Sequence, residues 1–155
     1  MSSTRAYLDA LRMLARRELS EAQVRQRLAR RSHDSDQIDD AVARLKQEGA
    51  IDDRRVAEAI ARTEMSLRKR GRLRVKRKIE SAGISSAVAK GAIDETFDAI
   101  DADALLEAAL AKRLRHGKSV SNDREFNRLY RYLVSQGFEP DRVLARLKRA
   151  RQDRE

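Results

Sequence analysis

The segment of this 155-residue chain with the clearest chemistry is a run of cations at residues 68–78. Eight of its eleven residues are basic and none is acidic: Arg68, Lys69, Arg70, Arg72, Arg74, Lys76, Arg77 and Lys78. Like charges packed this densely repel one another and lower stability unless an anionic partner is present. Phosphates or an acidic protein surface would be such partners, and arginine suits planar, bidentate contacts with them. The alternative is a solvated helix face that only keeps the protein soluble.

Positive charge is concentrated in blocks along the chain, which has 35 basic and 25 acidic residues and a net charge of +10. Residues 79–111 carry a net −6 and residues 112–155 a net +7. The second block supplies weaker candidates for contact with nucleic acid or a protein partner: Arg113, Arg115, Lys118, Arg128 and Arg131. Aromatic residues make up only 4% of the chain. Stacking platforms for single strands are therefore scarce, and we expect any DNA contact to be weak and independent of sequence.

Residues suited to catalysis or metal binding are few and scattered. His33 and His116 lie in separate polar loops, and Asp34 beside His33 is better explained as part of a helix-capping loop. Asp52 and Asp53 resemble a carboxylate pair for magnesium, but helix capping and compensation of the helix dipole account for them more simply. The chain lacks cysteine, a phosphate-binding loop, a dinucleotide glycine fingerprint and a zincin motif. We expect no catalytic residue, no cofactor and no metal.

The composition indicates an all-α protein. Six glycines, one proline and few aromatic residues argue against a β-sandwich or barrel. The six aromatic side chains are expected mainly in the core. No apolar run approaches the 18 or more residues of a membrane span, and the first seven residues lack the apolar core of a secretory signal. We therefore expect a cytoplasmic protein with no membrane contact, and a monomer.

Helix boundaries can be predicted from apolar spacing and capping residues. Leu8, Leu11 and Leu14 mark one side of a first helix. Ser20 is expected to cap the second helix and Ser35 or Asp36 the third, which ends at Gly49. The next helix follows Asp52 and Asp53, with Val56, Ile60, Met65 and Leu67 on its buried side.

The remaining boundaries follow the same signals. Gly71 and Gly83 interrupt the pattern, and Ser85 or Ser86 caps the sixth helix. A seventh helix is expected to begin near Asp101 or Asp103 and an eighth after Ser121 or Asn122, while Pro140 falls in the first turn of the last.

The apolar positions form an internal repeat. Val24, Leu28, Ile38 and Val42 have offsets 0, 4, 14 and 18, which Leu129, Leu133, Val143 and Leu147 reproduce. Val75, Ile79, Val88 and Ala92 follow at 0, 4, 13 and 17. We predict three tandem three-helix repeats, at residues 1–50, 51–100 and 101–151, with a frayed tail at 152–155. Because one such unit buries little surface, the repeats should share their cores in an elongated, curved array. The alternative is a compact bundle of the same helices.

Several segments, in order, resemble the RecX family of regulatory proteins. They are residues 14–20 with Val24 and Leu28, the stretch from Leu45 to Ala57 containing Gly49 and the paired aspartates, Arg70-Gly71 with Ile79 and Gly83-Ile84, and Leu133 to Phe138 with Val143. The resemblance covers roughly residues 6 to 150. The chain departs from the family in having Ser32 where a glycine is frequent, Gly71-Arg72-Leu73 where a second glycine or a proline is common, and Ile51 and Val56 where aromatics are usual.

The resemblance implies a non-enzymatic regulator with three tandem three-helix repeats. Proteins of this family bind the groove of the RecA–DNA filament and inhibit its ATPase, strand-exchange and coprotease activities, by limiting filament growth or promoting disassembly. Two other functions stay open from the residues themselves. Three-helix units with short turns are also typical of general DNA-binding proteins and transcription factors, and a structural or adaptor rod would use its cations for solubility alone.

Overall fold

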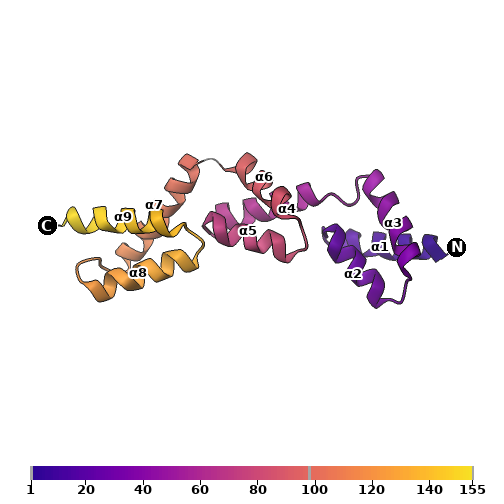
Figure 1. The fold of residues 1–155 in the computed structure, drawn as a ribbon, viewed down its shortest axis with the longest axis horizontal. Coiled ribbons are helices and arrows are strands. Elements are labelled where there is room, and N and C mark those ends of the chain that lie inside the picture. The colour runs from indigo at the N-terminus through magenta and orange to yellow at the C-terminus, as the bar shows by residue number, and fades with distance from the viewer. Residues whose placement is uncertain (1, 98, 155) are drawn as a thin grey trace. The chain divides into compact units, whose positions relative to one another are not determined.

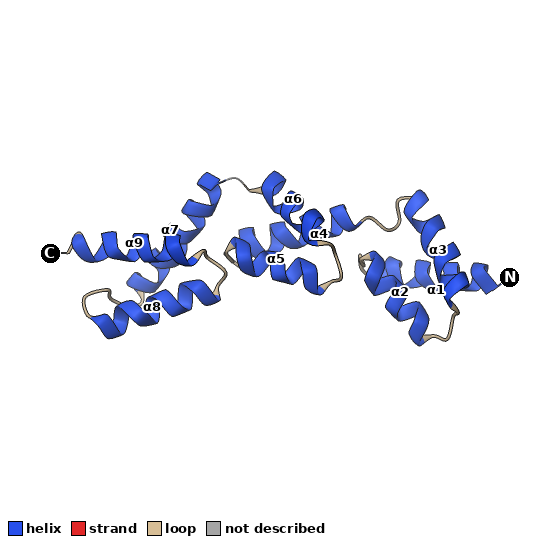
Figure 2. Ribbon diagram, viewed as in Figure 1, coloured by secondary structure: helices blue, strands red, loops and turns tan. Residues whose placement is uncertain are grey.

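The protein is built from helices. The computed structural model describes residues 2–97 and 99–154, and within them the chain forms nine α-helices and one π-helix, with no strand (Figure 2). The all-α prediction is confirmed. Of the helices described, none combines the length and the apolar character needed to cross a lipid bilayer.

The chain divides into two compact units, which are described separately. Unit 1 comprises Met1–Ala59 and Ile79–Ala92, and unit 2 comprises Ile60–Lys78 and Ile93–Glu155. The elongated, curved arrangement and the division into three repeats stay predictions. The predicted frayed tail begins where the last helix ends, at Gln152, and its residue 155 lies outside the described residues.

Unit 1 opens with three helices, α1 (Ser2–Arg16), α2 (Glu21–Arg30) and α3 (Ser35–Gln47), which carry the indigo and purple colours of Figure 1. The leucines place the first helix correctly, and Leu11 and Leu14 are half-buried and pack against the core, but none of the three is fully buried. Ala6, Ala10 and Met13 are buried instead, and Leu8 is 46% exposed. The small alanines allow α1 to approach the apolar side chains of α2 and α3, which are Val24, Leu28, Ile38, Val42 and Leu45.

Capping residues fix the ends of these helices. Ser20 caps α2 as predicted, because its side chain accepts a hydrogen bond from the backbone N–H of Gln23. The predicted cap of α3 is wrong: Asp34, not Ser35 or Asp36, accepts from the backbone N–H of Gln37. Gly49 follows α3 at a φ of +76°, where glycine is favoured, as expected.

The second half of unit 1 contains the starts of two helices and their caps. Asp52 accepts from the backbone N–H of Arg55 at 3.2 Å and begins α4 (Asp53–Arg62). The neighbouring Asp53 accepts from the backbone N–H of Glu21 at 2.8 Å. Ser85 accepts from the N–H of Val88 at 3.2 Å and begins α6 (Ser86–Thr96). Asp52 thus caps the helix that follows it, as predicted, whereas Asp53 binds the backbone at the start of α2.

Unit 2 contains the π-helix η1 (Thr63–Leu67), α7 (Ala99–Arg115), α8 (Asp123–Ser135), α9 (Pro140–Gln152) and most of α5 (Arg72–Ser81). The helices α8 and α9, orange and yellow in Figure 1, lie side by side. Asn122 caps α8 and Pro140 occupies the first turn of α9, as predicted. The seventh helix already runs at Ala99, ahead of the predicted start near Asp101 or Asp103.

The predicted repeat positions lie in the core. Eleven of the twelve are buried and Val88 is half-buried. The aromatic prediction is largely wrong, because only Phe138 is buried while the three tyrosines, Phe97 and Phe126 are half-buried. Small and medium aliphatic side chains, rather than aromatic rings, therefore fill these helical interfaces.

Leu67 is a clear failure of helical periodicity. It is 78% exposed although the pattern predicts burial, whereas Met65 is 1% exposed. The cause is the π-helix, in which the N–H of Arg68 donates to the carbonyl of Thr63, five residues earlier, at 3.2 Å. A π turn holds more residues than an α turn and rotates the following side chains out of phase. Leu67 is thereby turned away from the core.

Candidate anion-binding surface

The basic run at residues 68–78 begins with a tight change of chain direction. After η1, Lys69 has a φ of +56°, a left-handed conformation that few non-glycine residues adopt. The N–H of Arg70 donates to the carbonyl of Glu64 at 2.9 Å and closes the turn. Residues 68–71, three cations and a glycine, form this turn between η1 and α5, which starts at Arg72.

Gly71 anchors this run to the turn between α8 and α9. Its N–H donates to the carbonyl of Gln136 at 2.8 Å, and the N–H of Leu73 donates to the carbonyl of Gly137 at 2.9 Å. A Cβ added at Gly71 would lie closer than 3.0 Å to backbone atoms of Gly137 and Phe138, a separation that real Cβ atoms essentially never show. The close backbone approach thus depends on glycine.

Four arginines of the run bind within unit 2. Arg68 pairs with the buried carboxylate of Glu64 at 3.3 Å, and Arg72 pairs with Asp94. Arg70 donates to the side-chain oxygen of Gln136. Arg74 donates to the carbonyl of Ser135 at 3.3 Å. These guanidinium groups hold the turns of unit 2 together and are only partly available to an external anion.

The remaining cations of the run face solvent to different degrees. Lys69, Arg77 and Lys78 are exposed and Lys76 is half-buried. Among the residues the structure describes, neither Lys69 nor Arg77 has a side-chain hydrogen bond or ion pair. The run predicted as one contact block therefore consists of four arginines that stabilise the fold, the half-buried Lys76, and three exposed cations, of which Lys69 and Arg77 lack a described partner.

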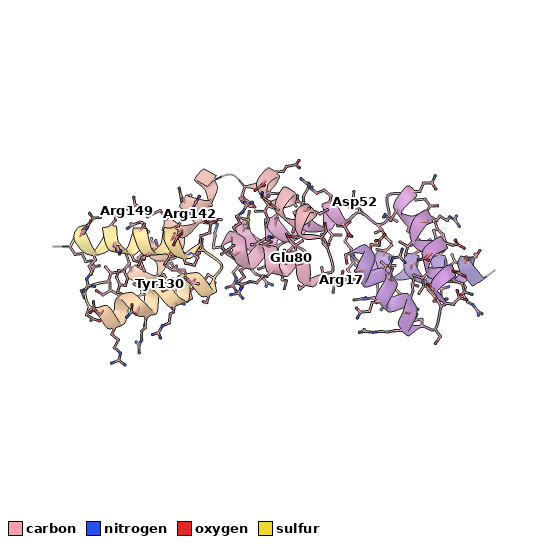
Figure 3. All side chains as sticks on the ribbon, viewed as in Figure 1. Arg17, Asp52, Glu80, Tyr130, Arg142 and Arg149 are labelled. Carbon is pink, nitrogen blue, oxygen red and sulfur yellow. The ribbon has the colours of Figure 1, made fainter. Side chains whose placement is uncertain are left out.

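The acidic residues of α7 are partly neutralised by arginines of α9. Arg142 pairs with Asp103 at 3.0 Å, and Arg146 holds Glu107 through two hydrogen bonds, one of 3.1 Å. The Glu107 carboxylate raises the pKa of Arg146 above its ordinary value. Arg149, labelled with Arg142 and Tyr130 in Figure 3, is exposed. Asp103 and Glu107, two of the acidic residues of the 79–111 segment, thus have a local structural role in unit 2.

Three of the five weaker candidates line one hollow of about 300 Å³: Arg113 from α7, Lys118 from the following loop, and Arg128 from α8. The guanidinium carbon of Arg113 lies 3.5 Å from the centre of the Tyr132 ring, a cation–π contact. Arg115 and Arg131 are exposed but do not line the hollow. These cations were predicted from their charge alone. They line the same hollow because the loop after α7 brings α8 back beside it.

Of the two histidines, His33 makes a side-chain contact within unit 1 and His116 is exposed. His33, whose side chain is 8% exposed, contacts Asp9 with 2.7 Å between Nε2 and Oδ2. This hydrogen bond and the charges of His33, Arg31 and Arg12 lower the pKa of Asp9. Among the residues described, no group of three or more histidine or acidic side chains is placed to hold a metal ion. Nothing in the sequence around His33 indicated its partner, which is 24 positions away.

A family model for the first three-helix domain of RecX matches residues 6–45. The regulatory protein RecX of Halorhodospira halophila is 35% identical, over 94% of this chain and 88% of its own length. The regulatory protein RecX of Chromohalobacter salexigens is also 35% identical, over 87% of this chain and 86% of its own. The crystal structure of RecX from Lactobacillus salivarius has the same fold, with a TM-score of 0.80, 21% identity, and coverage of 95% of this chain and 97% of that one.

Proposed function

Because this chain belongs to the RecX family of regulatory proteins, we propose that it binds the RecA–DNA filament and inhibits the filament's recombinase, ATPase and coprotease activities. It does so in the cytoplasm without catalysing a reaction, by limiting filament growth or promoting disassembly. The proposal includes a monomeric protein with three tandem three-helix repeats, at residues 1–50, 51–100 and 101–151, and weak, sequence-independent contact with DNA.

The observation that supports this proposal best is the exposure of Lys69 and Arg77 without a described partner. Both lie on a segment that is fixed at Gly71 by two backbone hydrogen bonds. Because the backbone of this segment is already fixed, only side-chain freedom is lost on binding, and the cations attract an anionic assembly over a distance of about 10 Å at 0.1 M salt. A filament offers many equivalent anionic sites, so several weak contacts can add up to firm binding.

The decisive experiment measures DNA-dependent ATP hydrolysis by RecA at substoichiometric amounts of this protein. We expect inhibition, and we expect the double variant Lys69→Glu, Arg77→Glu to need roughly ten times more protein for the same effect, because reversing two interface charges removes attraction and adds repulsion. This variant spares Arg72 and Arg74, whose substitution would also disturb unit 2. The matched control is Lys148→Glu, Arg149→Glu, which makes the same change in charge at exposed positions of α9.

Equal inhibition by both double variants and the unmodified protein would remove the exposed cations of residues 68–78 from the proposal. Complete absence of inhibition by the unmodified protein would refute the function itself. Electron microscopy of filaments with increasing amounts of protein supplies the structural readout, and filaments should become shorter.

Gel shifts with unrelated DNA duplexes at a fixed salt concentration separate this function from that of a general DNA-binding protein. We expect weak binding of similar strength to every duplex, with affinity falling with salt at a slope of about 0.7–0.9 per phosphate contact. Tight binding to one sequence without RecA would favour a transcription factor instead.

A further inference from the structure

We propose that the hollow between the end of α7, the following loop and the start of α8 binds a phosphate ester of nucleotide size. The hollow lies wholly within unit 2 and is about 300 Å³ in volume. This proposal rests on the geometry of the hollow and not on the regulatory function, so either can fail without the other.

Three cations of the hollow supply the charge that a phosphate needs. Lys118 and Arg128 are exposed, and neither has a side-chain ion pair or hydrogen bond to any residue that the structure describes. Arg113 is half-buried and its guanidinium is stacked on Tyr132. Stacking fixes the guanidinium plane and leaves its N–H groups, which lie at the edge of that plane, able to donate hydrogen bonds. The hollow therefore has two exposed cations without a described partner and one oriented cation.

The apolar part of the lining indicates that the ligand is more than an inorganic anion. Leu129 is buried and Tyr132 half-buried, and both line the hollow together with the cations. A bare phosphate would leave this apolar surface in contact with water. A nucleoside attached to the phosphate would cover it, and the volume lies at the small end of the range for sites that enclose organic ligands.

The loop that carries Lys118 is shaped by internal hydrogen bonds. The Ser119 hydroxyl accepts from the N–H of Ser121 at 3.0 Å and from Arg154 at 3.2 Å, and it donates to the Ser121 hydroxyl at 2.8 Å. Ser119 itself lines the hollow. The loop thus holds Lys118 close to the hollow before any ligand arrives, which lowers the entropy lost on binding.

One carboxylate in the lining limits the charge of the ligand. Glu125 lies beside the cations and accepts a hydrogen bond from the side-chain amide of Asn122 at 3.3 Å. With three cations and one carboxylate, the lining has a net charge of +2, which matches the charge of about −2 on a nucleoside monophosphate at pH 7 better than the higher charge of a triphosphate. Removing the charge of Glu125 should strengthen binding.

A phosphate with an attached nucleoside could come from either of two ligands, a free mononucleotide or one residue of a single-stranded nucleic acid. The full chain is titrated with thymidine monophosphate, thymidine, inorganic phosphate and a tetrathymidylate, followed by nitrogen–proton correlation NMR. We expect saturable shifts at residues 118–119 and 128–129 with the monophosphate, and at least about fivefold weaker binding of thymidine and phosphate. Tighter binding of the tetranucleotide identifies a strand as the source, and equal affinity identifies the free nucleotide.

Substitutions test which side chains bind. Lys118→Ala and Arg128→Ala should each weaken binding of the monophosphate by about five- to tenfold, the effect of one charge-assisted hydrogen bond near the surface. Arg124→Ala removes equal charge from an exposed position of α8 outside the lining, and should change affinity less than about twofold. Glu125→Gln should strengthen binding about two- to fivefold, while Asp141→Asn, exposed on α9, should not.

Three results would overturn the proposal. They are the absence of saturable shifts with the monophosphate, inorganic phosphate binding as tightly as the monophosphate, and an equal loss of affinity in the control variants. The last result would mean that the basic charge of the chain attracts nucleotides without a defined site.

Discussion

Gly71→Ala tests the backbone contact that holds the cationic run against the α8–α9 turn. A Cβ at this position would lie closer than 3.0 Å to the backbone of Gly137 and Phe138. These are main-chain atoms, so no flexible side chain can move aside, and the two segments must separate by roughly 1 Å to restore van der Waals distance. Hydrogen bonds of 2.8 and 2.9 Å from Gly71 and Leu73 would then be stretched beyond 3.5 Å.

The expected cost follows from those losses. Two backbone hydrogen bonds contribute about 1 kcal/mol each, and the strain of forcing a methyl group into a packed contact adds about 1–3 kcal/mol. The smaller conformational freedom of alanine in the unfolded chain returns about 0.4–1 kcal/mol. We therefore expect Gly71→Ala to lower the free energy of unfolding by about 2–5 kcal/mol, measured by urea denaturation followed by circular dichroism at 222 nm.

Gly91→Ala is the matched control, because the chemical change is the same and the surroundings differ. The nearest neighbour of a Cβ at Gly91, at 2.7 Å, is Nη1 of Arg54, the end of a flexible side chain. Gly91 lies inside α6, where alanine is favoured over glycine by about 1 kcal/mol. Arg54 must move, and weakening its 2.9 Å hydrogen bond to the Gly91 carbonyl costs up to about 1 kcal/mol, so we expect a net change within about 1 kcal/mol of zero. A Gly71→Ala variant as stable as the unmodified protein would refute the close-contact reasoning.

Three further predictions concern stability and titration. Asp9→Asn should cost about 1–2 kcal/mol at pH 7 in urea denaturation. The hydrogen bond from His33 lowers the pKa of Asp9 in the folded state. The stability difference between the two proteins is therefore fully present at a pH above the ordinary pKa of aspartate, and it should shrink as the pH falls below about 4. Met65→Ala should cost about 2–5 kcal/mol and Leu67→Ala less than about 0.5 kcal/mol in the same assay, and equal costs would contradict the π-helix register. The phenol of Tyr7 donates to the Glu48 carboxylate at 2.6 Å, which raises its pKa, so ultraviolet titration should show tyrosine ionisation above the ordinary range, and Tyr7→Phe should abolish that phase.

Local interactions made much of the fold predictable. The caps formed by Ser20, Ser85 and Asn122 act over three residues, and the apolar repeat acts over one or two helical turns. Because these interactions join residues that are close in sequence, they can be recognised without the tertiary structure. The wrong cap of α3 shows how narrow the margin is, since Asp34 and Ser35 are adjacent and both residue types cap helices well.

The candidate site was less predictable, because whether a cation is exposed or bound within the fold depends on residues distant in sequence. Charge alone marked residues 68–78, yet Arg70 and Arg74 bind groups about sixty positions away, at Gln136 and Ser135. The convergence of Arg113 and Arg128 on one hollow likewise depends on how α7 and α8 pack. The apolar periodicity of a single helix does not indicate which distant residues its cations will contact.

The sequence by itself determined that this protein is helical, basic, repetitive and similar to RecX regulators, because helix propensity, capping and apolar spacing are properties of neighbouring residues. Only the tertiary structure decided which cations stabilise the fold and which stay exposed, as with Arg72, paired with Asp94, and Arg77. The physical reason is that the energy of an ion pair or a close backbone contact depends on the distance between its atoms in space. The separation of the two residues in sequence does not indicate that distance.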